Sequence, residues 1–161
     1  KEFFMKKALF SIFIGLAASL ANAGDFVNHI NNKAQDIPQT HVQIINFWAA
    51  WCKPCRKEMP DMSKWYTQIG KKQKVGMVGI AIDSPENVSQ FLKQVPVKYP
   101  ILRYTGTNSR AMMSQFGNQI GGLPYTVIRA PKCAYEEKIV GELTFDRLNQ
   151  AVQKAQSSSS K

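Results

Sequence analysis

Apolar residues follow two different periodicities along the chain. Two segments rich in β-branched and other apolar residues, 42–48 and 75–82, are typical of buried strands. Between them, apolar side chains recur at helical spacing from Lys53 to Ile69, and Gly70 ends this predicted helix. This order predicts parallel strands joined by a crossover helix.

The second half continues with shorter elements. The pattern predicts, in chain order, a helix from Pro85 capped by Ser84, a short extended piece at 99–102, a helix at 109–116, strands at 125–129 and 138–140, and a last helix capped by Thr144. A turn at 131–134 joins the last two strands and predicts an antiparallel hairpin. Residues 24–39 are weakly amphipathic and predict a short helix. The whole is expected to be a single α/β domain.

The first residues have the features of an export signal. Two lysines follow Met5, and then come an apolar run over 8–20 and the small-x-small sequence Ala21-Asn22-Ala23. This pattern predicts a signal peptide over 5–23 that is cleaved after Ala23. A membrane anchor is the alternative, but the run is shorter than the roughly 20 residues that a bilayer requires. We therefore expect a periplasmic or otherwise exported protein with no stable membrane span.

The predicted domain occupies residues 24–155. We interpret residues 1–4, which precede Met5, as extraneous to the protein, and residues 156–161, with four consecutive serines, as a disordered tail. The sequence carries a formal net charge of +10, and the part after Ala23, with 18 basic and 10 acidic residues, carries +8. Such a charge favours acidic partners or anionic surfaces. The basic residues are scattered, so no nucleic-acid partner is expected.

Two of the three cysteines lie in the segment Trp51-Cys52-Lys53-Pro54-Cys55, which joins a predicted strand to a predicted helix. The first turn of a helix leaves backbone N–H groups unpaired and carries a partial positive charge. A thiolate at Cys52 would be stabilised there, with Lys53 adding a positive charge, so its pKa should fall below the usual value of about 8.5. Cys55 lies inside the helix and is the candidate resolving thiol.

These segments resemble the TlpA and ResA family of exported thioredoxin-like oxidoreductases. The resemblance extends over 42–154 and rests on the sequences at 46–52, 56–60, 78–83 and 121–128. It implies a thioredoxin fold: a central mixed sheet of about four to five strands, flanked by helices, with a TlpA-type central insertion. It also implies that the Cys52–Cys55 disulfide is the redox group and that no further cofactor is needed.

The resemblance also implies roles for other residues. Pro124 would be a cis-proline that faces Cys52 and exposes the backbone of Leu123 to a substrate peptide, with Trp51 nearby. The Lys53-Pro54 dipeptide belongs to the motif, and the proline at 124 would keep metals away from the dithiol. The alternative for Pro124 is an ordinary trans-proline that begins a strand.

Glu58 is the candidate proton-transfer residue. It lies three residues after Cys55, on the same side of the predicted helix. The resemblance implies that this glutamate assists proton transfer as a general acid or base. A solvated helix carboxylate is the alternative. Asn46 stands where typical thioredoxins have a buried acid, and an amide cannot transfer protons.

Cys133 lies in the predicted hairpin turn, far from the other two cysteines in sequence. A free, exposed thiol is the favoured interpretation, and a disulfide to a partner or a second copy is the alternative. The three cysteines with His29 or His41 could form a zinc site, but the setting of Cys52 favours redox chemistry, so no metal is expected.

The leading hypothesis is a reductase of protein disulfides that receives electrons from a membrane-bound thiol donor, as in cytochrome c biogenesis. The alternatives are a thiol oxidase or isomerase of exported proteins, and a non-enzymatic metal-binding or partner-binding module. A peroxidase is disfavoured because Ala49 stands where a peroxidatic motif has a threonine. The family's amino-terminal β-hairpin is expected to be missing, or replaced by residues 24–40.

Overall fold

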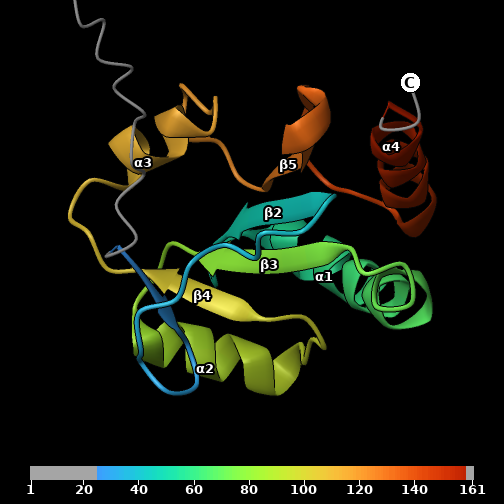
Figure 1. Ribbon diagram of the computed structural model, residues 1–161. Coiled ribbons are helices and arrows are strands. Elements are labelled where there is room, and N and C mark those ends of the chain that lie inside the picture. The colour runs from blue at the N-terminus through green and yellow to red at the C-terminus, as the bar shows by residue number, and fades with distance from the viewer. Residues whose placement is uncertain (1–24, 159–161) are drawn as a thin grey trace, which may run out of the picture.

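The computed structural model describes residues 25–158 and centres on one six-stranded sheet (Figure 1). In chain order the strands are β1 (Phe26–Asn28), β2 (Gln43–Trp48), β3 (Gly76–Ala81), β4 (Ile101–Tyr104), β5 (Tyr125–Ala130) and β6 (Tyr135–Val140). They lie side by side in the order β1-β4-β3-β2-β5-β6. Strands β2, β3 and β4 are mutually parallel, whereas β1, β5 and β6 pair antiparallel with their neighbours. The predicted mixed sheet is confirmed, with six strands rather than four to five.

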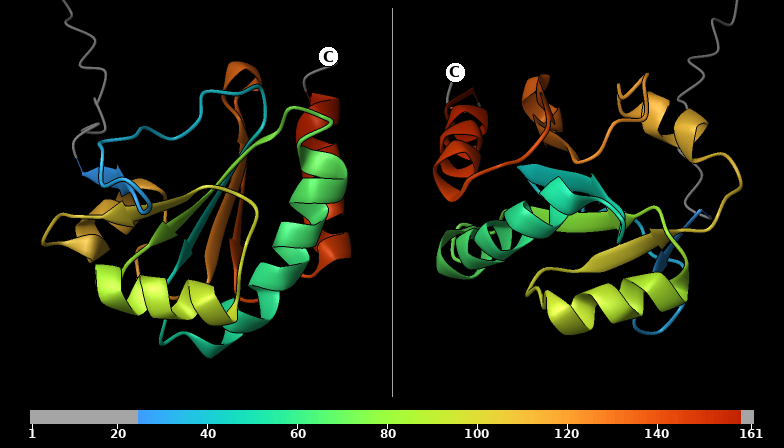
Figure 2. Two further views of the ribbon diagram at one scale, coloured as in Figure 1. Left: turned by 90° about the horizontal axis from the view of Figure 1, so that it is seen from below. Right: turned by 180° about the vertical axis from the view of Figure 1, so that it is seen from behind.

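Helices cover both faces of this sheet. They are α1 (Lys53–Trp65), which continues into the π-helical turn η1 (Tyr66–Gly70), α2 (Pro85–Gln94), α3 (Ser109–Gln115), the 3₁₀ turn η2 (Pro131–Cys133) and α4 (Phe145–Ser157). Helices α1, α2 and α4 bury one face of the sheet, and α3 packs on the opposite face. Figure 2 shows α1 and α4 side by side from two directions. None of the helices in the described part is long and apolar enough to cross a bilayer.

The central strands follow from their composition. Every residue of β2 and β3 is buried, as the two apolar runs predicted. The predicted helix starts also hold: Ser84 and Thr144 accept hydrogen bonds from the backbone N–H groups of Asn87 and Arg147. The loop between β2 and α1, which contains Trp51, therefore begins at the end of a fully buried strand.

The helix predicted over 24–39 is wrong. Residues 26–28 form β1 instead, and an isolated antiparallel bridge joins Val27 to Ala34. The cause is local: the side chain of Asn28 accepts hydrogen bonds from the N–H groups of Ile30 and Asn31, which closes a turn. This segment supplies a short antiparallel pairing where the amino-terminal hairpin was expected to be missing or replaced.

Further boundaries differ from the predictions, including β4, which covers 101–104 rather than 99–102. Strand β6 begins at Tyr135 rather than at 138. The prediction missed its first residues because their side chains alternate between partial burial and exposure, so they form no apolar run. The predicted tail at 156–161 begins too early, because α4 includes Gln156 and Ser157. The Ser157 hydroxyl donates to the carbonyl of Lys154 and extends the helix. Residues 159–161, the predicted signal peptide at 5–23 and residues 1–4 lie outside the described part of the chain.

Candidate active site

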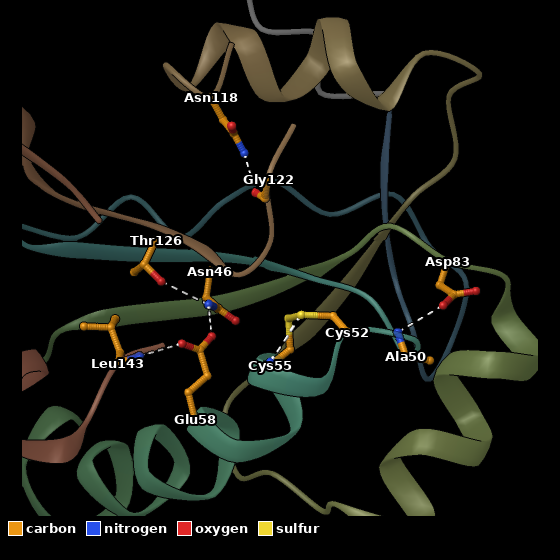
Figure 3. The surroundings of a disulfide bond; sticks show 10 residues. All are labelled: Asn46, Ala50, Cys52, Cys55, Glu58, Asp83, Asn118, Gly122, Thr126 and Leu143. Atoms are coloured by element: carbon orange, nitrogen blue, oxygen red, sulfur yellow. Dashed lines mark hydrogen bonds between the residues drawn. A yellow bond between two sulfur atoms is a disulfide. The ribbon is translucent and has the colours of Figure 1, made fainter. Parts of the chain in front are cut away.

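Cys52 and Cys55 form a disulfide at the start of α1 (Figure 3). Their Cα atoms are 5.3 Å apart. Cys52 is the N-cap residue of α1, and its Sγ accepts a hydrogen bond from the backbone N–H of Cys55 at 3.3 Å. Cys52 retains 3% exposure, whereas Cys55 is fully buried. The sulfur of Cys52 therefore lies at the positive end of the helix, and Cys52 is the one of the two residues that retains any exposure.

Asp83 fixes the loop before Cys52. Its Oδ2 accepts a hydrogen bond from the N–H of Ala50 at 3.0 Å, and its Oδ1 accepts from the Asn87 side chain at 2.7 Å. Asp83 therefore joins the dithiol loop to the first turn of α2. We did not predict this role, although the position was informative: an acid directly after a buried parallel strand lies at the sheet edge where these strands end.

Glu58 is buried one helical turn after Cys55. The residue is 1% exposed, and its carboxylate accepts hydrogen bonds from the Asn46 side chain at 2.8 Å and from the N–H of Leu143 at 2.9 Å. Burial raises the pKa of Glu58 to about 7, outweighing these two hydrogen bonds, which act to lower it. The alternative of a solvated helix carboxylate is wrong. At neutral pH this carboxyl group can both accept and donate a proton.

Asn46 shapes the surroundings of that acid. Its side-chain NH₂ group also donates to the hydroxyl of Thr126 at 3.0 Å. The amide thus uses both of its hydrogens to join Glu58 on α1 to Thr126 on β5 across the buried end of β2 (Figure 3). Thr126 and Leu143 contribute to the site from distant parts of the sequence, and neither was predicted.

The loop before β5, called the cis-proline loop below, contains a cis peptide bond between Leu123 and Pro124, so the alternative of a trans-proline is wrong. Pro124 is buried and Leu123 is partly buried. The buried side chain of Asn118 forms two hydrogen bonds with the backbone of this loop. It donates to the carbonyl of Gly122 at 2.8 Å and accepts from the N–H of Gly121 at 3.0 Å. Asn118 was not predicted, because its partners are the backbone of the loop itself.

Replacing Asn118 by alanine should loosen this loop. The change removes two hydrogen bonds and leaves the carbonyl of Gly122 without its partner, so we expect the free energy of unfolding to fall by about 2 kcal/mol. Urea denaturation followed by circular dichroism measures this. The exposed neighbour Gln119, replaced by alanine, is the matched control and should change stability by less than about 0.5 kcal/mol. Equal stabilities of the two variants would contradict this role of Asn118.

The remaining predicted residues lie around the dithiol or away from it. Trp51 is 71% exposed beside Cys52, and Lys53 and Pro54 are exposed on the first turn of α1. Cys133 is free, but it is partly buried against the core in η2 rather than fully exposed. Among the described residues, no three side chains of the kinds that bind metals come together.

Comparisons with known proteins agree with this geometry. The sequence profile of the AhpC/TSA family matches residues 21–133. The thiol-disulfide oxidoreductase ResA of Bacillus cereus is 36% identical over 114 residues, which cover 69% of this chain and 61% of the relative. ResA of Oceanobacillus iheyensis is 30% identical over 125 residues, which cover 71% and 62%. This chain therefore spans about three fifths of the length of these curated relatives.

Solved structures are also similar. The thioredoxin-related protein from Neisseria meningitidis serogroup B has 50% identity and a TM-score of 0.78, with 83% of this chain and 99% of that chain covered. A thiol:disulfide interchange protein from Chlorobium tepidum TLS has 26% identity and a TM-score of 0.65, with 82% and 94% covered. Together these matches confirm the predicted thioredoxin-like fold.

Proposed function

Because this chain belongs to the AhpC/TSA family and has a thioredoxin-like fold, we propose that it is a thiol–disulfide oxidoreductase whose redox pair is Cys52 and Cys55. One observation carries the proposal: the sulfur of Cys52 caps α1 and accepts a backbone N–H, within disulfide distance of a second, fully buried sulfur. Such an environment stabilises a thiolate, which is the nucleophile in disulfide exchange. The ResA relatives, which share this part of the sequence, support the assignment.

The chemistry proceeds in two exchanges. The Cys52 thiolate attacks one sulfur of a substrate disulfide, which forms a mixed disulfide and releases one substrate thiolate. Cys55 then loses its proton and attacks the Cys52 sulfur, which releases the second substrate thiolate and leaves the Cys52–Cys55 disulfide. Two electrons pass from the dithiol to the substrate, and no cofactor other than this disulfide takes part. We assign Glu58 as the group that accepts the Cys55 proton, because it lies one turn further along α1 and burial raises its pKa to about 7.

Three groups are proposed to bind the substrate. Trp51 presents an exposed ring beside the attacking sulfur, and Pro124 with the backbone of Leu123 forms the loop opposite. An extended substrate segment can pair with such a backbone as an added strand. The substrate class is therefore a polypeptide that carries a disulfide.

We assign the direction as reduction of protein disulfides outside the cytoplasm. The Lys53-Pro54 dipeptide resembles that of reducing relatives, and the signal sequence predicted at 5–23 fits an exported protein. A membrane-bound thiol donor would restore the dithiol, as cytochrome c biogenesis requires. Oxidation or isomerisation of exported proteins is the alternative direction.

The reduction potential decides between the two directions. Equilibration of the purified protein with glutathione buffers, followed by alkylation of free thiols, measures it. A value near about −250 mV supports reduction, and a value near about −120 mV would assign the protein as an oxidase. Turnover of insulin disulfides with dithiothreitol as the reductant tests the activity itself.

Serine in place of Cys55 should arrest the reaction at the mixed disulfide. Cys52 can still attack, but no second thiol follows, so substrates stay covalently bound through Cys52. Nonreducing gels and mass spectrometry of the exported fraction would show adducts that dithiothreitol releases. The double variant with Cys52→Ser and Cys55→Ser is the control and should form none. Adducts joined through Cys133 would overturn the assignment of Cys52 as the attacking thiol.

A further inference from the structure

A groove lies beside the dithiol, next to the loop that Asp83 holds. Its volume is about 270 Å³, and Ala50, Trp51 and Arg56 form one wall. The other wall is one stripe of α2, with residues at positions i, i+3, i+4 and i+7: Asn87, Gln90, Phe91 and Gln94. Figure 3 shows Ala50 and Asp83, two of the residues that line the groove, on one side of Cys52 and Gly122 on another. The groove therefore begins next to Cys52, at its neighbours Ala50 and Trp51, and none of residues 121–124 lines it.

Arg56 is held in a fixed position in this groove. Its guanidinium carbon lies 4.7 Å from the centre of the Phe91 ring, and its Nη1 donates to the Gln94 side chain at 3.0 Å. Phe91 is itself 2% exposed, so the platform under the guanidinium is rigid. Among the described residues, no carboxylate forms an ion pair with Arg56. A preorganised, positively charged fork with free N–H groups is suited to bind a carboxylate.

Asp83, the acidic residue that lines the groove, already accepts hydrogen bonds from the protein. The carboxylate of Asp83 accepts hydrogen bonds from the backbone N–H groups of Ala50 and Ser84 and from the side chain of Asn87. These donors stabilise the carboxylate in place, although its formal negative charge remains. The first turn of α1 contains no acidic residue and carries the exposed Lys53. The groove is therefore lined by one cationic side chain, Arg56, and by one carboxylate whose oxygens already accept hydrogen bonds from the protein.

We propose that this groove is a subsite for the polypeptide that carries the target disulfide, and that Arg56 binds an aspartate or glutamate side chain of that polypeptide. The inference rests on the proposed function and adds a substrate preference to it. Arg56 lies one helical turn after Cys52, and the Cβ atoms of residues at this spacing are about 6 Å apart. A bound carboxylate would therefore belong to a residue two or three positions from the attacked cysteine, since an extended chain advances about 3.3 Å per residue.

A set of synthetic disulfide peptides tests this preference. The peptides carry glutamate, glutamine or lysine at one position, placed two or three residues before or after the target cysteine, and are otherwise identical. At low ionic strength we expect kcat/KM to be about threefold higher for the best glutamate peptide than for its glutamine counterpart, and lower for the lysine peptide. The ratio should fall towards one at high salt, because exposed charges are then screened.

Two substitutions test whether Arg56 causes the preference for the glutamate peptide. In Arg56→Gln the ratio of kcat/KM for the glutamate peptide to that for the glutamine peptide should fall to about one. Both peptides are measured on the same variant, so a general loss of activity does not change this ratio. Lys57→Gln is the matched control: it removes a neighbouring charge that pairs with Glu142 and does not line the groove, so the ratio should remain. Equal rates for all peptides, or a ratio that survives Arg56→Gln, would overturn the inference alone. Failure to reduce any peptide, or insulin, would overturn the proposed function as well.

Discussion

Serine in place of Cys52 is expected to abolish disulfide reduction, with kcat/KM for insulin falling by at least about a thousandfold. A serine hydroxyl does not ionise at neutral pH and cannot form the mixed disulfide that the mechanism requires. The substitution is close in size and keeps a hydrogen-bond acceptor at the N-cap of α1, where Cys52 now accepts the N–H of Cys55. The loss should therefore be chemical rather than structural. Turnover of insulin with dithiothreitol measures it, and circular dichroism verifies the fold.

Cys133 provides the matched control for that experiment. It is the free cysteine of the described chain and lies in η2, which follows β5 at the end away from the cis-proline loop. Cys133→Ser should keep the wild-type rate within about twofold, because its sulfur takes no part in either exchange. Retained activity in Cys52→Ser, or lost activity in Cys133→Ser, would reassign the nucleophile.

The stability of the oxidised protein should fall as the pH rises from 4.5 to 7, because of Glu58. Burial raises the pKa of this carboxyl from 4.5 to about 7. In that range the native state therefore holds a proton that the unfolded state has lost, and a rise in pH favours unfolding. The stabilisation is complete below pH 4.5 and is lost by about pH 7, a difference of about 3 kcal/mol in the free energy of unfolding.

Glu58→Gln should remove this pH dependence. The glutamine keeps the shape and an oxygen acceptor but does not ionise, so the difference between wild type and variant isolates Glu58 from other titrating groups. Urea denaturation at a series of pH values measures it. Glu86→Gln, an exposed acid on the first turn of α2, is the control and should run parallel to wild type. A wild-type curve parallel to that of Glu58→Gln would show that Glu58 ionises as an ordinary carboxyl group.

The central strands and the dithiol could be predicted because their signals are local. The apolar runs that became β2 and β3 report burial directly, and the spacing of Cys52 and Cys55 shows that both lie at the start of one helix. The position of Glu58 near the dithiol could also be predicted from local spacing, because it lies one helical turn after Cys55. What the local pattern could not show is its burial, which depends on Leu143, 85 residues away.

Other parts of the site could not be predicted for different reasons. Asn118 acts through the backbone of Gly121 and Gly122, and backbone hydrogen bonds leave no pattern in the sequence. The groove beside Cys52 arises because α2 packs next to the start of α1, so that Arg56 reaches Phe91 across 35 residues of sequence. In the amino-terminal segment, the side chain of Asn28 favours a turn that overrides a weak helical periodicity.

The state of the Cys52 sulfur in the reduced protein tests the central claim most directly. The rate of alkylation of Cys52 by iodoacetamide, followed against pH in the Cys133→Ser background and assigned by mass spectrometry, reports the ionisation of this thiol. If the start of α1 stabilises the thiolate, the midpoint will lie clearly below the value of about 8.5 found for a free thiol, and Cys52 will react before Cys55. A midpoint at the free-thiol value, or faster labelling of Cys55, would contradict the account.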